Sequence, residues 1–202
     1  MAGILNKVFP SLVWNIPTKK KVIYLTFDDG PHTKLTPFIL QELAKYNAKA
    51  TFFLLGKEAE SKPSLHRELL ENNHSVGNHT FSHPNGWLTK NSRYYSDVEK
   101  CNKVLNTKLF RPPYGKIKPA QIWRLRKTYK IIMWDVLSWD FHEKMTPKNC
   151  FNFIKKKTKN GSIIVFHEND KALENVTYCL PKTLKYFSER GYEFKAIEAT
   201  DL

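Results

Sequence analysis

The sequence predicts an α/β fold built on parallel strands. Short β-rich apolar runs alternate with segments of helical apolar spacing from residue 21 to the end of the chain. Strands that alternate with helices are parallel, because each helix returns the chain to the same edge of the sheet. Two architectures fit such an alternation, an open doubly wound sheet and a closed barrel. Seven units in about 180 residues are too few for a full eightfold barrel, which needs about 250 residues.

The strand predictions rest on short runs rich in β-branched and aromatic residues that stop at turn-forming residues. The first run, KVIYLTF, ends at an Asp-Asp-Gly-Pro turn, and the second, ATFFLL, is closed by Gly56. The short run before Pro112-Pro113 and the run SIIVF fit the same pattern. In chain order, the predicted strands are residues 21–27, 50–55, 75–78, 109–111, 130–136, 162–166 and 192–197.

The helix predictions rest on apolar residues at helical spacing and on residues that favour helix starts. Pro37 suits a first turn, because its missing N–H has no helical partner there. Ser92 suits an N-cap position. Pro181 predicts an interruption of the last helix. In chain order, the predicted helices are residues 36–46, 63–72, 92–105, 119–128, 147–157 and 174–190.

The composition indicates one globular domain. Among the 202 residues, 41% are hydrophobic and 13% aromatic, which excludes intrinsic disorder. No linker, repeat or composition break divides the chain, so we expect one domain at residues 21–202 and, before it, an extension at residues 1–20 that packs on its body. Cys101, Cys150 and Cys179 are odd in number and widely spaced, which indicates no disulfide framework.

Charge and hydropathy limit the partners and the location. Lys and Arg number 33 against 19 Asp and Glu, and the formal net charge of +14 suits an anionic partner. No nucleic-acid-binding module is recognisable, so we expect no specific nucleic acid. No apolar run approaches the roughly 20 residues of a transmembrane span, and no signal peptide is visible. The compartment is left open: the cytoplasm is favoured, and export to the cell envelope is the alternative. The oligomeric state is left open as well.

Polar side chains follow five of the predicted strands. In parallel α/β folds the carboxyl ends of the strands form the edge at which ligands bind. Five polar groups on one edge are hard to explain by stability alone, so we expect a functional site there. The residues are Asp28, Asp29, His79, His83, Arg111, Tyr114, Asp135, Asp140, His167 and Glu168.

A pair of histidines among these residues points to a metal. His79 and His83 are four residues apart, which on a helical turn places both imidazoles on one face. With one carboxylate they make a three-ligand set that keeps a position open for water or substrate. Either Asp28 or Asp29 can supply the carboxylate, and the other can then act as a general base, because neighbouring side chains point in different directions. Taken alone, each motif is also compatible with ordinary polar surface or a simple turn.

Three further residues each have a catalytic and a structural interpretation. Arg111 can orient a carboxylate base and favour its ionised form, or form a structural ion pair. Tyr114 can stabilise an oxyanion through its backbone N–H or its hydroxyl, or cap the Pro-Pro turn. His167 can be a general acid, or a core histidine whose hydrogen bonds are satisfied.

At these residues the sequence resembles the polysaccharide deacetylase family, the NodB-like carbohydrate esterase family 4. The resemblance runs from about residue 21 to residue 197. The first family motif, T-F-D-D-G, stands at residues 26–30; the second, H-[ST]-x-x-H, at 79–83; and the third, R-x-x-Y-G, at 111–115. The fifth, normally L-x-H, appears as Val-Phe-His at 165–167.

The resemblance implies a fold, a cofactor and a role for each residue. The implied fold is a single-domain distorted (β/α) barrel of about seven parallel strands with outer helices. The implied cofactor is a divalent metal, usually Zn²⁺, with Co²⁺ or Ni²⁺ as alternatives, and its ligands are Asp29, His79 and His83. The implied catalytic groups are Asp28 as the base that activates water, Arg111 to orient Asp28, the backbone of Tyr114 for the oxyanion, and His167 as the acid that protonates the leaving amine.

The fourth family motif, usually D-x-x-D-W, departs from the pattern and reads Leu-Ser-Trp-Asp-Phe at residues 137–141. Leu137 stands where an Asp commonly pairs with the catalytic His. We expect Asp135, two residues earlier on the same strand face, or Asp140 to take over this pairing. Glu168 also stands where an Asp is frequent.

The implied reaction is hydrolysis of the acetamide of N-acetylated amino sugars in a peptidoglycan-like or chitin-like polysaccharide or oligosaccharide, with release of acetate. We expect five residues to border this substrate, namely Pro112, Pro113, Trp87, Trp139 and Phe166. The alternatives are a hydrolase of a non-sugar C–N amide bond on the same fold and a catalytically silent carbohydrate-binding relative.

Overall fold

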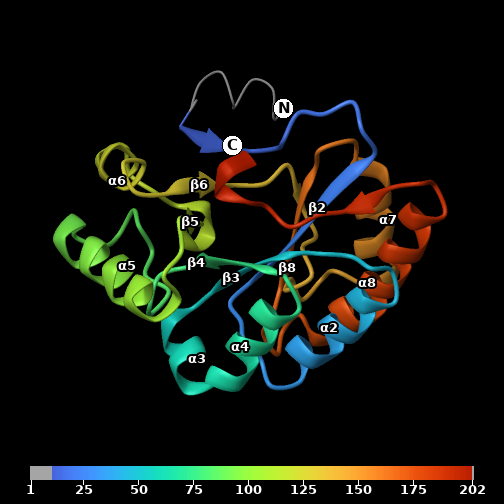
Figure 1. Ribbon diagram of the computed structural model, residues 1–202, viewed down its shortest axis with the longest axis horizontal. Coiled ribbons are helices and arrows are strands. Elements are labelled where there is room, and N and C mark those ends of the chain that lie inside the picture. Colours follow the sequence, from blue (N-terminus) through green and yellow to red (C-terminus); the bar gives the residue numbers. More distant parts are fainter. Residues whose placement is uncertain (1–10, 202) are drawn as a thin grey trace.

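The computed structural model describes residues 11–201 and confirms the parallel α/β fold, in which a curled sheet is surrounded by helices (Figure 1). The strands are β1 Leu12–Val13, β2 Val22–Asp28, β3 Thr51–Leu54, β4 Ser75–Asn78, β5 Leu109–Phe110, β6 Lys130–Ile132, β7 Val136–Leu137, β8 Ile163–His167 and β9 Glu193–Phe194. The α-helices are α2 Leu35–Ala44, α3 Gly56–Ser61, α4 Pro63–Glu71, α5 Asn91–Leu105, α6 Pro119–Leu125, α7 Pro147–Lys157 and α8 Leu173–Ser188, and short 3₁₀ turns cover η1 Pro113–Gly115 and η2 Ala199–Asp201.

The strands are arranged in the order β1-β6-β5-β4-β3-β2-β8-β7, and β9 pairs with the start of β2. Every strand pair is parallel. The carboxyl ends of the strands therefore meet on one side of the molecule, as the alternation of strands and helices predicts.

The sheet closes into a distorted barrel at the segment that follows β6. The single strand predicted at residues 130–136 is wrong, because this segment divides into β6 and β7, which pair with opposite sides of the sheet. Between them, Met133 N–H donates to Val13 O (2.7 Å) and Asp135 N–H donates to Ile163 O (3.3 Å). One short stretch of chain thus bridges β1 on one side and β8 on the other.

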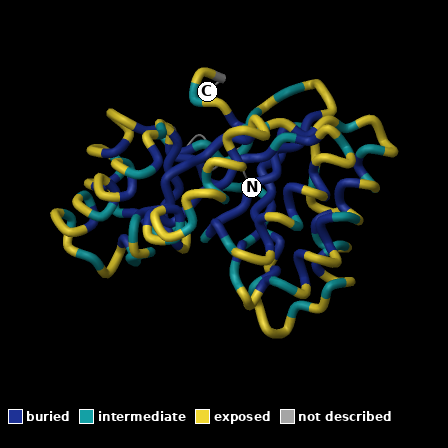
Figure 2. The backbone as a smooth tube through the Cα atoms, turned by 60° about the horizontal axis from the view of Figure 1, so that its bottom comes forward, coloured by how far each residue is buried: buried dark blue, intermediate teal, exposed yellow. Residues whose placement is uncertain are grey.

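The side chains of the central strands alternate between two environments. Ile23, Leu25 and Phe27 of β2 face the helices, where the Phe27 ring stacks on Phe52 (5.0 Å between centroids). Val22 and Tyr24 belong to a separate apolar cluster inside the barrel. Figure 2 shows the buried strands running through the middle of the molecule and the exposed residues on the outer helices. By the same alternation, Thr26 and Asp28 lie on the inner face of the barrel.

Three features of the helices and termini differ from the sequence predictions. The predicted interruption at Pro181 is wrong, because α8 is continuous through this residue and buries Cys179, Leu180 and Leu184 on both sides of it. Helix α3 and strand β1 are additional elements, and both are shorter than the windows on which periodicity depends.

The division between an extension at residues 1–20 and a domain at residues 21–202 remains a prediction, and residues 1–10 lie outside the described residues. Within the described part, β1 adds a parallel strand beside β6. None of the helices between residues 11 and 201 is long and apolar enough to cross a membrane.

Candidate active site

A cavity of about 650 Å³ opens at the carboxyl ends of the strands, where the sequence places its polar residues. It collects side chains from the ends of β2, β7 and β8 and from the loops that follow β2, β4, β5, β6, β7 and β8. Its lining residues are Asp28, Asp29, His79, His83, Pro112, Tyr114, Trp134, Leu137, Trp139, Phe141, Val165, His167, Asn169, Asp170 and Lys171.

Asp29, His79 and His83 converge on one point of this cavity. Their ligand atoms all lie within 4.8 Å of one another. Asp29 Oδ1 is 3.3 Å from His83 Nε2 and 3.7 Å from His79 Nε2. The oxygen is buried, and no donor among the described residues hydrogen-bonds to it. A buried carboxylate oxygen between two imidazole nitrogens fits a metal ligand, because a metal ion would supply the missing partner.

Each of the three side chains is held by its other polar atom. His79 Nδ1–H donates to Arg111 O (2.8 Å), His83 Nδ1 lies 3.1 Å from the Tyr114 hydroxyl, and Asn169 Nδ2 donates to Asp29 Oδ2 (2.8 Å). These bonds orient both Nε2 atoms and Asp29 Oδ1 towards the shared point. This arrangement, in which outer hydrogen bonds fix the tautomer and the ring orientation, is typical of metal-binding histidines.

The protonation states also suit a cation. Burial and the neighbouring His79 lower the pKa of His83 to about 4, so its imidazole is neutral at neutral pH. Burial alone would raise the pKa of Asp29, but the nearby imidazoles and the Asn169 amide outweigh it and lower this pKa. A neutral imidazole and an ionised carboxylate are the forms that bind metal.

The local structure that brings His79 and His83 together differs from the one that the sequence predicts. Residues 79–83 form a loop rather than a helical turn, so the helical argument for their pairing is wrong. Thr80 and His83 have left-handed backbones with φ of 68° and 61°. Asp97 in α5 holds the loop from outside by accepting the Phe81 N–H (2.7 Å) and the Ser82 N–H (3.0 Å).

Asp28 points into the cavity beside this set and is held by Arg111. The Arg111 guanidinium is fully buried and donates from Nη1 to Asp28 Oδ1 (2.7 Å). It also donates to the Thr26 hydroxyl and to the carbonyls of Ile132 and Met133. These contacts occupy one oxygen of Asp28 and leave Oδ2, 4.0 Å from His79 Nε2, towards the cavity.

His167 lines the cavity from the end of β8, beside Asp28 of β2, and is paired with Asp140. The two Asp140 oxygens accept the His167 backbone N–H and its Nδ1–H, both at 2.7 Å. Burial alone would lower the pKa of His167, but the fully buried Asp140 carboxylate outweighs it and raises this pKa to about 9. The imidazole is therefore protonated at neutral pH, and its Nε2 is left for the cavity.

The structure separates the two aspartates that the sequence left open. Asp135 turns away from His167 and accepts from the Ser162 hydroxyl (3.0 Å) and the Ile163 N–H (2.8 Å). The change to Leu137 in the fourth motif does not remove the partner of the imidazole, because Asp140 supplies it.

Glu168 does not line the cavity. It is buried behind Gly30, where a Cβ would lie only 2.2 Å from its Oε2, and its Oε1 accepts from the Thr36 hydroxyl (2.5 Å).

The residues expected to border the substrate divide into two groups. Pro112 and Trp139 line the cavity. Tyr114, which the resemblance implies for the oxyanion, lines it as well, with 60% of its surface exposed. Pro113 and Trp87 are not among the lining residues, and the Trp87 indole donates to Ile117 O (3.2 Å). Phe166 is fully buried against Phe27 on the helix-facing side of β8, which contradicts its expected role. Val165 faces the cavity instead, because side chains alternate along the strand.

Several cavity residues were not predicted from the sequence. Asn169 holds Asp29, and the Phe141 ring packs edge-on against His167 (4.6 Å between centroids). Trp134, Leu137, Asp170 and Lys171 also line the cavity. Asn169 follows His167 by two residues at the end of β8, so the strand-end rule could have identified it.

Left-handed backbone is concentrated around this cavity. Among the described residues that are not glycine, five with positive φ border or hold it: Asp29, Thr80, His83, Tyr114 and Trp139. Such backbone is costly for residues with a Cβ and persists where the surroundings determine it, which is typical of functional sites.

Comparison with known proteins agrees with this geometry. The family model described as "Polysaccharide deacetylase" matches residues 15–131. A peptidoglycan-N-acetylglucosamine deacetylase of Bacillus cereus is 33% identical over 88% of this chain and 67% of its own length. The peptidoglycan-N-acetylglucosamine deacetylase PgdA of Listeria monocytogenes is 34% identical over 98% of this chain, which spans 44% of that protein.

The fold comparison gives the same result. The crystal structure of the Bc1960 peptidoglycan N-acetylglucosamine deacetylase superimposes with a TM-score of 0.89 and 31% identity, covering 95% of this chain and 94% of that one. The sequence match covers more than half of the chain, and the structural match covers nearly all of it. The chain belongs to the polysaccharide deacetylase family.

Proposed function

We propose that this protein is a metal-dependent deacetylase that hydrolyses the acetamide of N-acetylated amino sugars in a peptidoglycan-like polymer and releases acetate. One observation carries the proposal. A three-residue ligand set shares one cavity with a carboxylate held by a buried arginine and an imidazole held by a buried aspartate. Amide hydrolysis needs a base for the attacking water and an acid for the leaving amine, and these two groups both line the cavity.

Asp29, His79 and His83 would hold the metal. Two imidazole nitrogens and one carboxylate oxygen suit Zn²⁺ well, and Co²⁺ and Ni²⁺ accept the same donors. When bound, such an ion lowers the pKa of water and polarises a carbonyl group. We infer Zn²⁺ as the native ion.

Asp28 acts as the general base. Its Oδ1 is fixed by Arg111 at 2.7 Å, so its Oδ2 accepts the proton of the attacking water. Because Arg111 is bound by two carbonyl groups at the end of β6, it cannot rotate away to leave Asp28 unpaired.

His167 acts as the general acid. Its Nδ1–H is bound to Asp140, so the Nε2–H is the one that reaches the substrate. As the C–N bond breaks, Nε2 donates its proton to the leaving nitrogen, which departs as a neutral amine. The backbone N–H of Tyr114 donates to the carbonyl oxygen as negative charge develops on it.

The substrate proposal rests on the cavity and on the relatives. Trp139 and Pro112 offer flat apolar faces on which a sugar ring can stack, and Leu137 and Val165 offer an apolar wall for the acetyl methyl group. The relatives named for peptidoglycan deacetylation favour a polymer of this kind over chitin. Lys171, exposed at the rim, suits the carboxylates of peptidoglycan.

The test is acetate release from a substrate panel. Protein stripped with a chelator and then reloaded with Zn²⁺, Co²⁺ or Ni²⁺ is assayed on peptidoglycan glycan strands, on N-acetylglucosamine oligomers and on a non-sugar acetamide. We expect acetate from the glycan strands with metal and none without it. Release from the non-sugar amide alone would favour the other hydrolase, and no release from any substrate with bound metal would favour a silent relative.

A further inference from the structure

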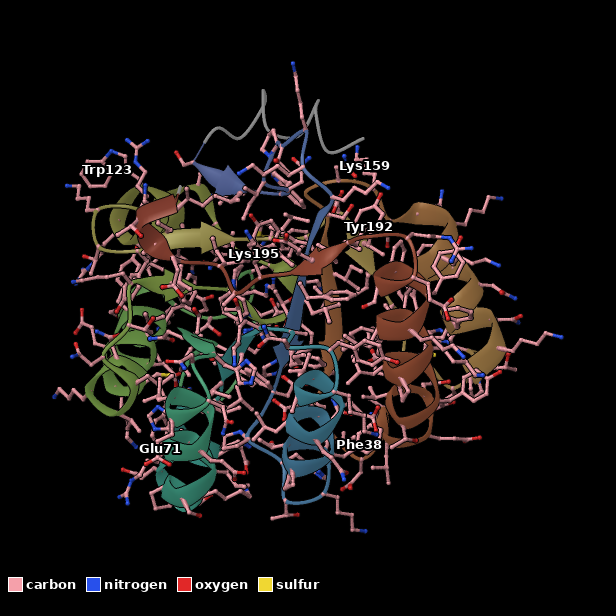
Figure 3. The ribbon with its side chains drawn as sticks, turned by 45° about the vertical axis from the view of Figure 1, so that its right-hand side comes forward. Phe38, Glu71, Trp123, Lys159, Tyr192 and Lys195 are labelled. Carbon is pink, nitrogen blue, oxygen red and sulfur yellow. The ribbon has the colours of Figure 1, made fainter. Side chains whose placement is uncertain are left out.

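Two of the three cysteines meet between neighbouring helices. Cys150 lies in α7 and Cys179 in α8, and both are fully buried in the same apolar cluster. The two helices pack along each other, and Figure 3 shows α8 running below the labelled Tyr192 with α7 beside it. The third cysteine, Cys101, lies in α5, apart from both helices (Figure 1), and its thiol donates to Leu54 O (3.8 Å).

The thiols of Cys150 and Cys179 are in hydrogen-bond contact. Cys179 Sγ–H donates to Pro147 O (3.1 Å), in the first turn of α7. Cys150 follows Pro147 by three residues, and a helical side chain leans back over the turn before it, so the Cys150 thiol lies near the same carbonyl group. A hydrogen bond between the Cys150 and Cys179 thiols, together with burial, raises the pKa of Cys150. The two thiols therefore form a short chain of hydrogen bonds that ends on α7.

Helix α8 can supply the small movement that a covalent bond needs. The two sulfurs must approach from hydrogen-bond distance to about 2 Å. Pro181 has no N–H to donate to Thr177 O, so the turn of α8 that carries Cys179 lacks one backbone hydrogen bond. This turn can shift towards α7 without breaking a bond of the helix.

We propose that Cys150 and Cys179 form a disulfide bond when this chain folds in the presence of a small-molecule disulfide such as oxidised glutathione. The thiolate of one cysteine attacks a sulfur of the oxidant, which gives a mixed disulfide and releases one thiol. The thiolate of the other cysteine then attacks the cysteine sulfur of the mixed disulfide and releases the second thiol. The two cysteines lose two protons and two electrons, and the disulfide of the oxidant is reduced to two thiols.

Burial determines when this exchange takes place. The thiolate is the reacting form, and in the folded protein Cys150 stays protonated and neither sulfur is exposed to solvent. The exchange therefore proceeds while the chain folds, before α7 and α8 close on each other. Once the bond has formed, the same burial shields it from reduction.

The bond would tie α7 to the part of α8 that supports the proposed acid. Asn175, one turn before Cys179, donates to Asp140 O (2.7 Å) and to Met145 O (3.2 Å). Asp140 in turn holds His167. The crosslink therefore stabilises the support of the cavity from outside, and the inference does not depend on which reaction the cavity performs.

The test compares the whole protein refolded from urea with oxidised and reduced glutathione and the whole protein refolded with dithiothreitol alone. After glutathione, we expect non-reducing peptide mapping to find residues 150 and 179 in one crosslinked pair of peptides, and a thiol assay in denaturant to find only Cys101 free. For a closed loop of about 30 residues in a chain of this size, the bond should raise Tm by about 7–14 °C. Cys101→Ala should keep this shift, and Cys150→Ala and Cys179→Ala should each abolish it.

Three results would overturn the proposal. The first is three free thiols after refolding with glutathione, and the second is a main product in which the crosslink includes Cys101. The third is a crosslink between Cys150 and Cys179 that leaves Tm unchanged or lowers it, because the two helices would then not accommodate the bond. The comparison of oxidised and reduced wild type needs no substitution, so the outcome does not depend on whether the variants fold.

Discussion

Replacing Asp140 by Asn tests the proposed acid most directly. Both oxygens of Asp140 accept hydrogen bonds from His167, at 2.7 Å each. Asn keeps one acceptor and turns an NH₂ group towards the other donor, and it removes the negative charge. The His167 pKa of about 9 depends largely on that charge, so without it the value falls towards the ordinary 6.5, because burial lowers it while only Asp28 and Asp29 still raise it.

The size of the effect follows from these values. A general acid must be protonated, so activity is present below its pKa and is lost as the pH rises through it. At pH 8 about 90% of His167 is protonated with a pKa near 9, against about 3% with a pKa of 6.5. We therefore expect Asp140→Asn to lose about 30-fold at pH 8 through protonation alone and far less near pH 6. A bound divalent cation lowers both values by repulsion, so the separation between the two profiles is the quantity to compare.

The assay is acetate release between pH 5 and pH 10 at saturating metal, with metal content measured at each pH. Asp135→Asn is the matched control, because Asp135 binds Ser162 and Ile163 and not His167. We expect its alkaline limb to coincide with that of the wild type, and the limb of Asp140→Asn to move down by about two pH units. If the alkaline limbs of the pH–activity profiles coincide in all three proteins, the inference that Asp140 raises the pKa of His167 is refuted.

Three further predictions concern the neighbouring residues. Asp28→Asn should keep its metal and lose about 10²- to 10⁴-fold in activity, whereas Asp29→Asn should lose the metal; the reverse pattern by metal analysis would exchange their roles. Arg111→Ala should lower the free energy of unfolding by about 3–5 kcal/mol, because it leaves the buried Asp28 unpaired; urea denaturation within 1 kcal/mol of the wild type would contradict this. Asn169→Ala should raise the dissociation constant for Zn²⁺ about 10- to 100-fold in a chelator competition assay, and an unchanged constant would show that the amide does not position Asp29.

Local sequence patterns predicted most of the strand framework and the edge that carries the site. They succeeded because each strand is a short apolar run that ends at a polar turn, and parallel strands bring those turns together. They failed at residues 130–136, where one apolar run serves two sides of the barrel. Nothing in the run itself records this division, because it depends on how far the sheet curls.

The pairing of His167 with Asp140 rather than Asp135 also depends on tertiary structure and not on the local sequence. Both lie near the end of the same segment, and spacing along the chain gives each a route to His167. The structure separates them because Asp135 N–H is bound to Ile163 O at the closure of the barrel, which turns its carboxylate towards the start of β8. Asp140 lies beyond the strand, and Asn175 of α8 holds its carbonyl at 2.7 Å. Tertiary contacts decide which carboxylate faces the imidazole.

The loop at residues 79–83, which carries both histidines, shows most clearly that tertiary contacts determine the geometry of the site. An H-x₃-H pair on a helix and an H-x₃-H pair in a loop are identical in sequence, yet the helix supplies its geometry locally and the loop does not. Here the left-handed backbones of Thr80 and His83 cost free energy, which hydrogen bonds from elsewhere offset. Asn78 Oδ1 accepts the Thr80 N–H at 2.8 Å, and Asp97, sixteen residues further along in α5, accepts the Phe81 N–H. The position of His83 beside Asp29 and His79 therefore depends on a helix that supplies none of the three proposed ligands. The motif alone could identify these residues but not the conformation that brings them together.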